Sequence, residues 1–228
     1  MHFRQRLIDA ADQWPVEDSR LIRLINNPRT PHPLIAHFAL STFIGASHFA
    51  QAIALMFCQA SHPAAKTFLF ENLIEETGLV LRDRTVRYRP LQEHTAWARR
   101  FCHACQLNDA QLDAALKSAP RWPARAFALL EQHDWQAAIA YLVVGYERAS
   151  PRYMQAAYNA LLSRGFNKED VAFFHNHIEA DQMHGEAGVD ILASLAQSPA
   201  DEERLLQWVT EGAGDFWQGL NGNNHGRV

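Results

Sequence analysis

Cysteine is scarce in this chain of 228 residues, which has only Cys58, Cys102 and Cys105. Three thiols exclude a disulfide scaffold of the kind found in small secreted domains. Cys102 and Cys105 form a C-x-x-C pair that could have a redox role, but it lies inside a predicted helix, so a buried small apolar residue is the better interpretation of Cys105. An excess of positive charge is also absent, since the formal net charge is −4. We therefore expect no nucleic-acid partner.

Long apolar runs are absent as well. No uninterrupted apolar segment approaches the roughly 18 residues of a membrane span, and residues 1–6 are not followed by the apolar core of a signal peptide. We therefore expect a cytoplasmic protein that does not enter a membrane. Strand-like alternation, internal repeats and Pro/Gly/Ser-rich linkers are not found either. These absences leave one globular domain over residues 1–228, with an ordinary 48% of hydrophobic and 20% of charged residues.

Helical periodicity, by contrast, runs through most of the chain. It predicts helices over residues 3–12, 16–26, 33–59, 63–81, 90–106, 109–117, 122–132, 134–149, 151–164, 168–196 and 200–220. Four charges in residues 81–88 predict a loop between two of these helices. The fold class is therefore all-α, a helical bundle whose core lies in about residues 33–195. A C-terminal helix at 200–220 and a disordered tail at 221–228 complete the prediction.

The most informative segment is residues 175–186. On a helix, His177, Asp181 and His184 fall within about 60° of one another, on a stripe that is otherwise apolar. That stripe continues through Phe173, Phe174, Gly188, Ile191, Leu192 and Leu195. Burying two imidazoles and a carboxylate there costs several kcal/mol unless a partner compensates them. Since a metal ion can satisfy all three side chains at once, the triad predicts a metal site.

Further ligands have to come from the apolar faces of other helices. Glu76, His94 and Glu147 each lie on such a face, where an unpaired polar group is unfavourable. With the triad they make three carboxylates and three imidazoles, more than one ion needs. The two histidines of the triad are about 10 Å apart along a helix, a span that fits two ions with the aspartate between them. Mixed His/carboxylate sets with open positions are typical of non-haem iron that reacts with O2, whereas structural zinc tends to use four closed ligands.

Three segments of the chain resemble a known family: residues 72–78 (N-L-I-E-E-T-G), 146–151 (Y-E-R-A-S-P) and 177–184 (H-I-E-A-D-Q-M-H). They are similar to the haem-oxygenase-like di-metal oxidases, which include the chlamydial protein associating with death domains and relatives of TenA and of the pyrroloquinoline-quinone synthase. The resemblance covers about residues 33–195. Its most specific element is the H-x-x-x-D-x-x-H pattern of the third segment.

The resemblance assigns a set of six metal ligands, with Glu147 as the bridge. These are Glu76, His94, Glu147, His177, Asp181 and His184. The family's remaining histidine normally follows the position of Glu76 by about two helical turns, where this chain has Asp83. Residues 95–101 match the family's continuation, which assigns His94 and makes 81–89 an insertion. Asp83 stays open as the rival ligand.

The resemblance also implies a fold and an activity. The fold is a seven-helix, haem-oxygenase-like bundle (TenA/PqqC-like) that carries two Fe(II) ions and no haem, with manganese or a mixed pair left open. The activity is an O2-dependent oxidation of a small organic substrate that is amino-acid-like or fatty-acid-like. Outcomes in the family include C–C cleavage, N-oxygenation and self-sacrificing conversion of a tyrosine, and fold alone does not choose among them.

Other functions stay open at this point. One is a metal-free oxidase like the quinone synthase, and another is TenA-like hydrolysis, which needs a cysteine on a central helix, whereas no cysteine follows Cys105. A third is a non-enzymatic helical interaction module whose polar cluster is only a hydrogen-bond network. The C-terminal helix is apolar enough to pack on the bundle or on a second subunit of a homodimer.

Overall fold

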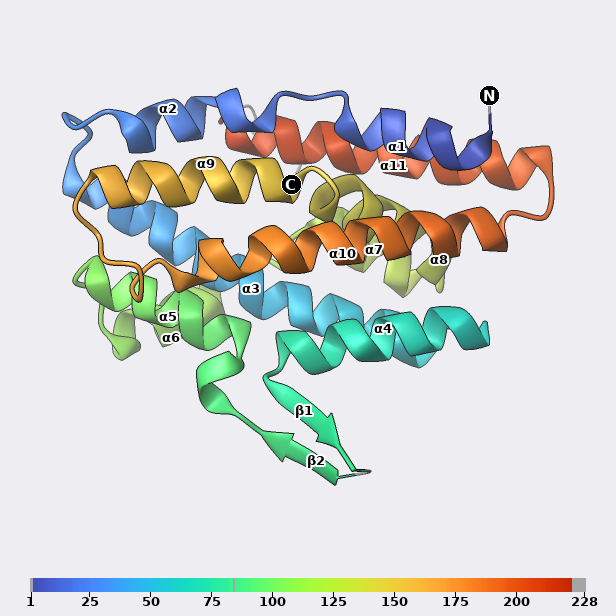
Figure 1. The fold of residues 1–228 in the computed structure, drawn as a ribbon, viewed down its shortest axis with the longest axis horizontal. Helices are drawn as coiled ribbons and strands as arrows, with labels where there is room; N and C mark the ends of the chain where they lie inside the picture. Colours follow the sequence, from blue (N-terminus) through green and yellow to red (C-terminus); the bar gives the residue numbers. More distant parts are fainter. Residues whose placement is uncertain (1, 84, 223–228) are drawn as a thin grey trace.

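The computed structural model describes residues 2–83 and 85–222. Within them the chain is a bundle of helices with one small hairpin, so the predicted all-α class is confirmed (Figure 1). The α-helices are α1 (Phe3–Asp12), α2 (Arg20–Asn26), α3 (His32–Gln59), α4 (Pro63–Glu76), α5 (His94–Ala104), α6 (Asp109–Ser118), α7 (Ala124–Glu131), α8 (Trp135–Ala138), α9 (Ser150–Ser163), α10 (Ala172–Leu195) and α11 (Pro199–Leu220). The 3₁₀ turns η1 (Val16–Asp18) and η2 (Pro90–Gln92) and the π-helix η3 (Ile139–Glu147) lie between them.

The long helices run along the long axis of the molecule in stacked layers (Figure 1). α10 packs against α9 and η3, α11 packs against η3 and α1, and α3 packs against α4 and α5. η3 is the centre of this arrangement, and all nine of its residues are buried. Residues of α1 and α11, such as Leu7 and Val209, are buried in the same core. The core therefore draws on both ends of the chain in addition to the expected range 33–195.

The predicted loop at residues 81–88 is wrong, because this segment forms an antiparallel hairpin that extends from the bundle (Figure 1). Strand β1 (Leu79–Arg82) pairs with β2 (Thr85–Tyr88) in the register Leu79 with Tyr88 and Leu81 with Val86. Cross-strand partners lie on one face, so apolar side chains share one side of the hairpin and arginines lie on the other. Because the hairpin begins at residue 79, α4 ends at Glu76 and not at the predicted residue 81.

The predicted α-helix at residues 134–149 is wrong in its geometry. Only Trp135–Ala138 is α-helical, and Ile139–Glu147 is a π-helix, in which each N–H bonds to the carbonyl five residues earlier. Residues five apart therefore share a face, and the rings of Tyr141 and Tyr146 have centroids 5.5 Å apart. Their hydroxyl oxygens lie 3.4 Å apart. Side chains that an α-helix would turn away from each other are thus brought together.

The C-terminal helix packs on the bundle of its own chain. Glycines allow the contact, because a Cβ on Gly212 would lie 2.1 Å from the carbonyl oxygen of Tyr141, and a Cβ on Gly145 would lie 2.9 Å from the Cα of Gly212. The backbones of η3 and α11 therefore lie in direct contact. Asn221 and Gly222 form a turn after α11, and the remainder of the predicted disordered tail, residues 223–228, lies outside the described residues.

One helix of the described chain, α3, is long and apolar enough to cross a membrane by length and composition alone. The core helix of a soluble protein passes the same test, and α3 packs against α4 and α5 in this bundle. The expectation that the protein does not enter a membrane stays a prediction.

Candidate metal centre

α10 presents the triad as its sequence predicts. His177, Asp181 and His184 are all buried on one face of this helix, while His175, Glu179 and other polar residues of the opposite face are exposed. The one-turn spacing of the three residues places their side chains in a row along the helix. α10 therefore supplies half of the predicted ligand set from a single rigid element.

The structure brings all six predicted residues together in two groups. The remaining three come from the C-terminal end of α4, the N-terminal end of α5 and the C-terminal end of η3. One group is Glu76, His94 and His177, and the other is Glu147, Asp181 and His184. Within each group, one ligand atom from every residue lies within 4.8 Å of the others. Every one of these side chains is buried, with a relative exposure of 3–7%.

In the first group the two imidazoles contact each other and the carboxylate. Nδ1 of His94 lies 3.0 Å from Oε1 of Glu76, and the rings of His94 and His177 have centroids 4.3 Å apart. Nδ1 of His177 donates to the carbonyl of Phe173 at 2.7 Å, which leaves Nε2 free for the cluster. Asp83, the rival of His94, is 93% exposed at the turn of the hairpin and does not reach either group.

In the second group the imidazole of His184 lies between two carboxylates. Its Nδ1 is 3.4 Å from Oε1 of Glu147, and its Nε2 donates to Oε2 of Glu75 at 3.0 Å. Glu75 is half-exposed, so it lies outside the buried cluster and contacts the outer nitrogen. In the sequence this residue is the first glutamate of the segment 72–78 (N-L-I-E-E-T-G), next to the predicted ligand Glu76. Its position is that of the carboxylate that typically orients a metal-bound histidine.

Burial and mutual contact shift the pKa values within the cluster in different directions. Burial lowers the pKa of His177 to about 3, so this imidazole is neutral. Burial also lowers the pKa of His184, but Glu147 and Glu75 outweigh this effect and raise it to about 11. Burial, followed by the charge of Glu147, raises the pKa of Asp181 well above its ordinary value. In the metal-free cluster, protons held by Asp181 and His184 therefore offset the negative charge of the carboxylates.

A metal ion fits this donor set. Nδ1 of His94, Nδ1 of His184 and Oε2 of Glu147 are buried and have no hydrogen-bond partner, although other cluster atoms are nearby. Buried polar atoms without partners are rare because each costs free energy. A cation at each group would satisfy these atoms and would replace the protons that the cluster otherwise holds.

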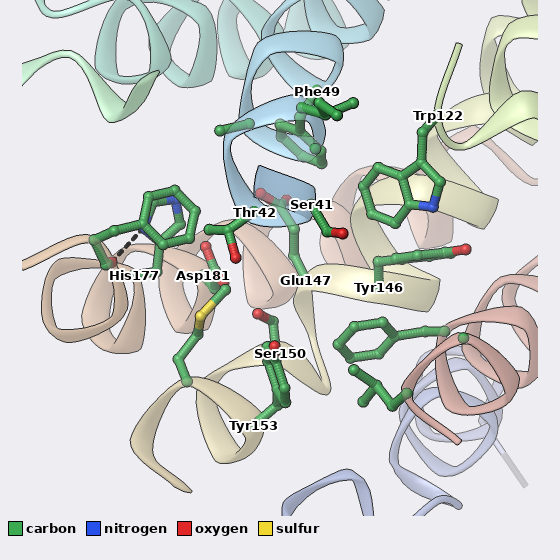
Figure 2. A pocket seen from close by; sticks show the side chains of 18 of the residues that line it. Ser41, Thr42, Phe49, Trp122, Tyr146, Glu147, Ser150, Tyr153, His177 and Asp181 are labelled. Carbon is green, nitrogen blue, oxygen red and sulfur yellow. Dashed lines mark hydrogen bonds between the residues drawn. The ribbon is translucent and has the colours of Figure 1, made fainter. Parts of the chain in front are cut away.

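A cavity of about 470 Å³ adjoins the cluster. Figure 2 shows His177 and Asp181 at one side of it, Glu147 near the middle, and Trp122 and Tyr146 at the other side. Its wall is mostly apolar and includes residues of α3, η3, α9, α10 and α11. Apart from the predicted ligands Glu76, Glu147, His177 and Asp181, the sequence did not identify this lining, because most of its other members are scattered over the chain without a common motif.

A family model described as iron-containing redox enzyme matches residues 36–216. The chain belongs to this family. The match covers the two residue groups and all the helices that carry them. The family description indicates a redox enzyme that contains iron. The buried His and carboxylate groups of this chain are suited to that metal. The comparison with curated proteins finds no match.

Solved structures support the haem-oxygenase-like fold of this family member. A TenA homologue from Pseudomonas syringae pv. tomato DC3000 superposes with a TM-score of 0.73 and 16% identity, over 95% of this chain and 90% of that chain. A domain of unknown function with a haem-oxygenase-like fold, from Shewanella denitrificans OS217, gives a TM-score of 0.61 and 18% identity over 96% and 94%. At these identities the likeness concerns the fold.

Proposed function

We propose that this protein is a non-haem di-iron oxidase or oxygenase that uses O2 to oxidise a small organic substrate. The observation that carries the proposal is the pairing of two adjoining three-residue groups in one buried cluster. Glu76, His94 and His177 form the set of two histidines and one carboxylate that is typical of non-haem Fe(II) oxygenases. The second group, Glu147, Asp181 and His184, has one histidine and two carboxylates. Two groups are suited to two ions, with Fe(II) favoured by the family and manganese or a mixed pair as the alternatives.

The surrounding residues prepare the site for oxidative chemistry. Bound iron would supply the electrons for the reaction with O2. Phe173 and Phe174 of α10 and Phe38 of α3 wall the cavity beside the cluster and limit the entry of water. Glu75 holds His184 by its outer nitrogen, so that Nδ1 faces Glu147. With three protein ligands each, bound ions would keep coordination positions for O2 and substrate.

The alternatives receive less support. TenA-like hydrolysis needs a cysteine nucleophile, and none of Cys58, Cys102 and Cys105 lines the cavity. Burial raises the pKa of both Cys102 and Cys105 to about 12, so neither is a ready thiolate. A metal-free oxidase or a non-enzymatic interaction module would leave the unpartnered buried atoms of the cluster without an explanation. The proposal also includes a cytoplasmic location and neither nucleic acid nor membrane as a partner, which rests on composition.

The proposal is tested by anaerobic ferrous titration of the metal-free protein, followed by exposure to O2 with stopped-flow absorbance. We expect two irons per chain and a transient visible absorbance band, and we expect His177→Ala to abolish the band. His175→Ala is the matched control, because His175 lies on the exposed face of the same helix. Failure of the wild-type protein to take up iron would refute the proposal.

A further inference from the structure

The cavity has a second polar feature away from the cluster, on α11. We propose that Asp215 is a binding subsite for the ammonium group of an apolar amine substrate. The inference deepens the proposed function, on which it rests for what happens to that substrate. It concerns the end of the substrate that does not react, and it stands on the charges and side chains that line the cavity.

Asp215 lies at the end of the cavity remote from the cluster. Its Oδ2 accepts a hydrogen bond from the hydroxyl of Tyr141 at 2.8 Å, and that hydroxyl is 3.4 Å from the hydroxyl of Tyr146. Figure 2 shows the side chain of Tyr146 extending away from Glu147, with its hydroxyl at the far tip. Asp215 and Tyr146 therefore line the far end of the cavity, with the buried Tyr141 behind them, and residues of the candidate metal groups line the near end.

The charges of the cavity wall favour a cation at this far end. Five ionisable acid or imidazole side chains contribute to the wall: Glu76, Glu147, His177, Asp181 and Asp215. The first four belong to the candidate metal groups. Asp215 is the only one that does not, and the wall includes neither lysine nor arginine. Within the described part of the chain Asp215 also takes part in no ion pair. A carboxylate-bearing substrate end would meet only repulsion there.

Hydrogen bonding to Tyr141 does not by itself require a charge. A neutral amide oxygen would accept the same bond, and the phenol occupies only Oδ2. Among residues 2–83 and 85–222, none donates to Oδ1, and the side chain of Asp215 is only partly buried beside the cavity. An ammonium group has three N–H donors and would supply both the missing bond and the opposite charge.

Aromatic rings complete the subsite. Tyr146 packs on Trp122 with ring centroids 5.5 Å apart and on Phe216 with centroids 5.1 Å apart. All three rings line the cavity next to Asp215. Ring faces attract ammonium groups, and a carboxylate among aromatic side chains is a common arrangement for recognising them. The rest of the wall is mostly apolar, with Leu21, Ile44 and Met154 among its members, so it suits a hydrocarbon body.

The substrate class that follows is a hydrophobic primary amine. Its ammonium group would bind Asp215, and its apolar body would extend through a cavity of about 470 Å³ toward the cluster. This narrows the amino-acid-like or fatty-acid-like expectation to molecules with a cationic group at the end remote from the reaction. A simple fatty acid does not meet that condition.

The test is calorimetric binding of n-octylammonium, n-octanoate and n-octanol to the full chain, both as purified and after chelator treatment. We expect n-octylammonium to bind the chelated protein at least about tenfold more tightly than n-octanoate. We expect Asp215→Asn, which keeps an acceptor for Tyr141, to weaken n-octylammonium about tenfold or more and to leave n-octanol unchanged, as for a charged hydrogen bond. Glu211→Gln is the matched control, because Glu211 lies one turn earlier on α11 and pairs with Arg125.

Three results would overturn the subsite: no binding of n-octylammonium, equal binding of n-octanoate by the chelated protein, or an unchanged affinity in Asp215→Asn. The comparison of the three ligands needs no variant, so it holds even if Asp215→Asn misfolds. Because the chelated protein is used, amine binding is independent of iron. Wild-type protein that binds the amine but takes up no iron would refute the di-iron proposal and keep the subsite.

Discussion

The contact between η3 and α11 gives a sharp prediction about two glycines of one helix. In Gly212→Ala, the new Cβ would lie 2.1 Å from the carbonyl oxygen of Tyr141, whereas ordinary contact begins at 3.4 Å. The atom it meets is backbone, which cannot rotate away, so α11 has to move by about 1.3 Å, the difference between these two distances. In Gly214→Ala the new Cβ meets nothing within 4 Å.

The two substitutions share their helix and their chemistry, so the difference between them isolates the clash. Alanine gains about 0.5–1 kcal/mol over glycine inside a helix, since it loses less conformational freedom on folding. Overpacking against a fixed neighbour costs about 1–3 kcal/mol. We therefore expect Gly214→Ala to raise the free energy of unfolding by about 0.5–1 kcal/mol and Gly212→Ala to lower it by up to about 2.5 kcal/mol.

The assay is equilibrium urea unfolding of the metal-free protein, followed by circular dichroism, because bound metal would add its own stabilisation. Displacement of α11 also carries Asp215 away from Tyr141, so Gly212→Ala has a second readout in weaker n-octylammonium binding. If Gly212→Ala unfolds at the same urea concentration as Gly214→Ala, the direct backbone contact and the argument built on it are wrong.

Three other predictions concern the candidate metal centre. Glu75→Gln should lower metal affinity about 10–100-fold with two ions still bound, because Glu75 orients His184 through its outer nitrogen. Glu71→Gln, which changes an exposed residue one turn earlier, should leave the affinity unchanged. Metal titration compares the two variants, and equal affinities would show that Glu75 is not part of the site. His94→Gln should lower the number of bound iron ions from two to one, whereas Asp83→Asn should leave two ions bound. Metal analysis after desalting measures this number. The reverse result would make Asp83 the ligand. Metal binding at pH 7 should release protons, because the pKa of His184, raised to about 11, keeps its imidazole protonated until a metal displaces the proton. Metal affinity should therefore rise with pH. Calorimetry in buffers of different ionisation enthalpy measures the number of protons released, and a value of zero would contradict this prediction.

Amphipathic helices made much of the fold and half of the site predictable. α10 has a polar face and an apolar face, so the burial of His177, Asp181 and His184 follows from their spacing. The bounds of α1 are as predicted, and those of α3, α6 and α9 agree within a residue or two. Glu76, His94 and Glu147 also lie where their apolar neighbours indicate, in the buried interior. Their role as ligands stays a proposal.

The wrong predictions concern segments whose local sequence pattern does not indicate the structure that they adopt. Residues 139–147 are apolar all round and wholly buried, so their sequence shows no face from which to read a helical phase. The hairpin was missed because each strand has only four residues, too few for a clear alternation, and because four of the eight residues 81–88 are charged. Asp215 belongs to no motif, and its place depends on how closely α11 approaches η3, which is decided by tertiary packing.

The π-helix has a consequence for how this site can change. In an α-helix, residues five apart point about 140° away from each other, so the hydroxyls of Tyr141 and Tyr146 could not meet. Loss of a single residue between them would let the segment relax to the commoner hydrogen-bonding register and would improve it as a helix. The same deletion would set the two tyrosines four residues apart, a spacing that an α-helix also keeps on one face. The wide turn of η3 therefore accommodates one extra residue without separating the tyrosines, and this is the place where the segment between α8 and Glu147 can change its length with the least effect on the site.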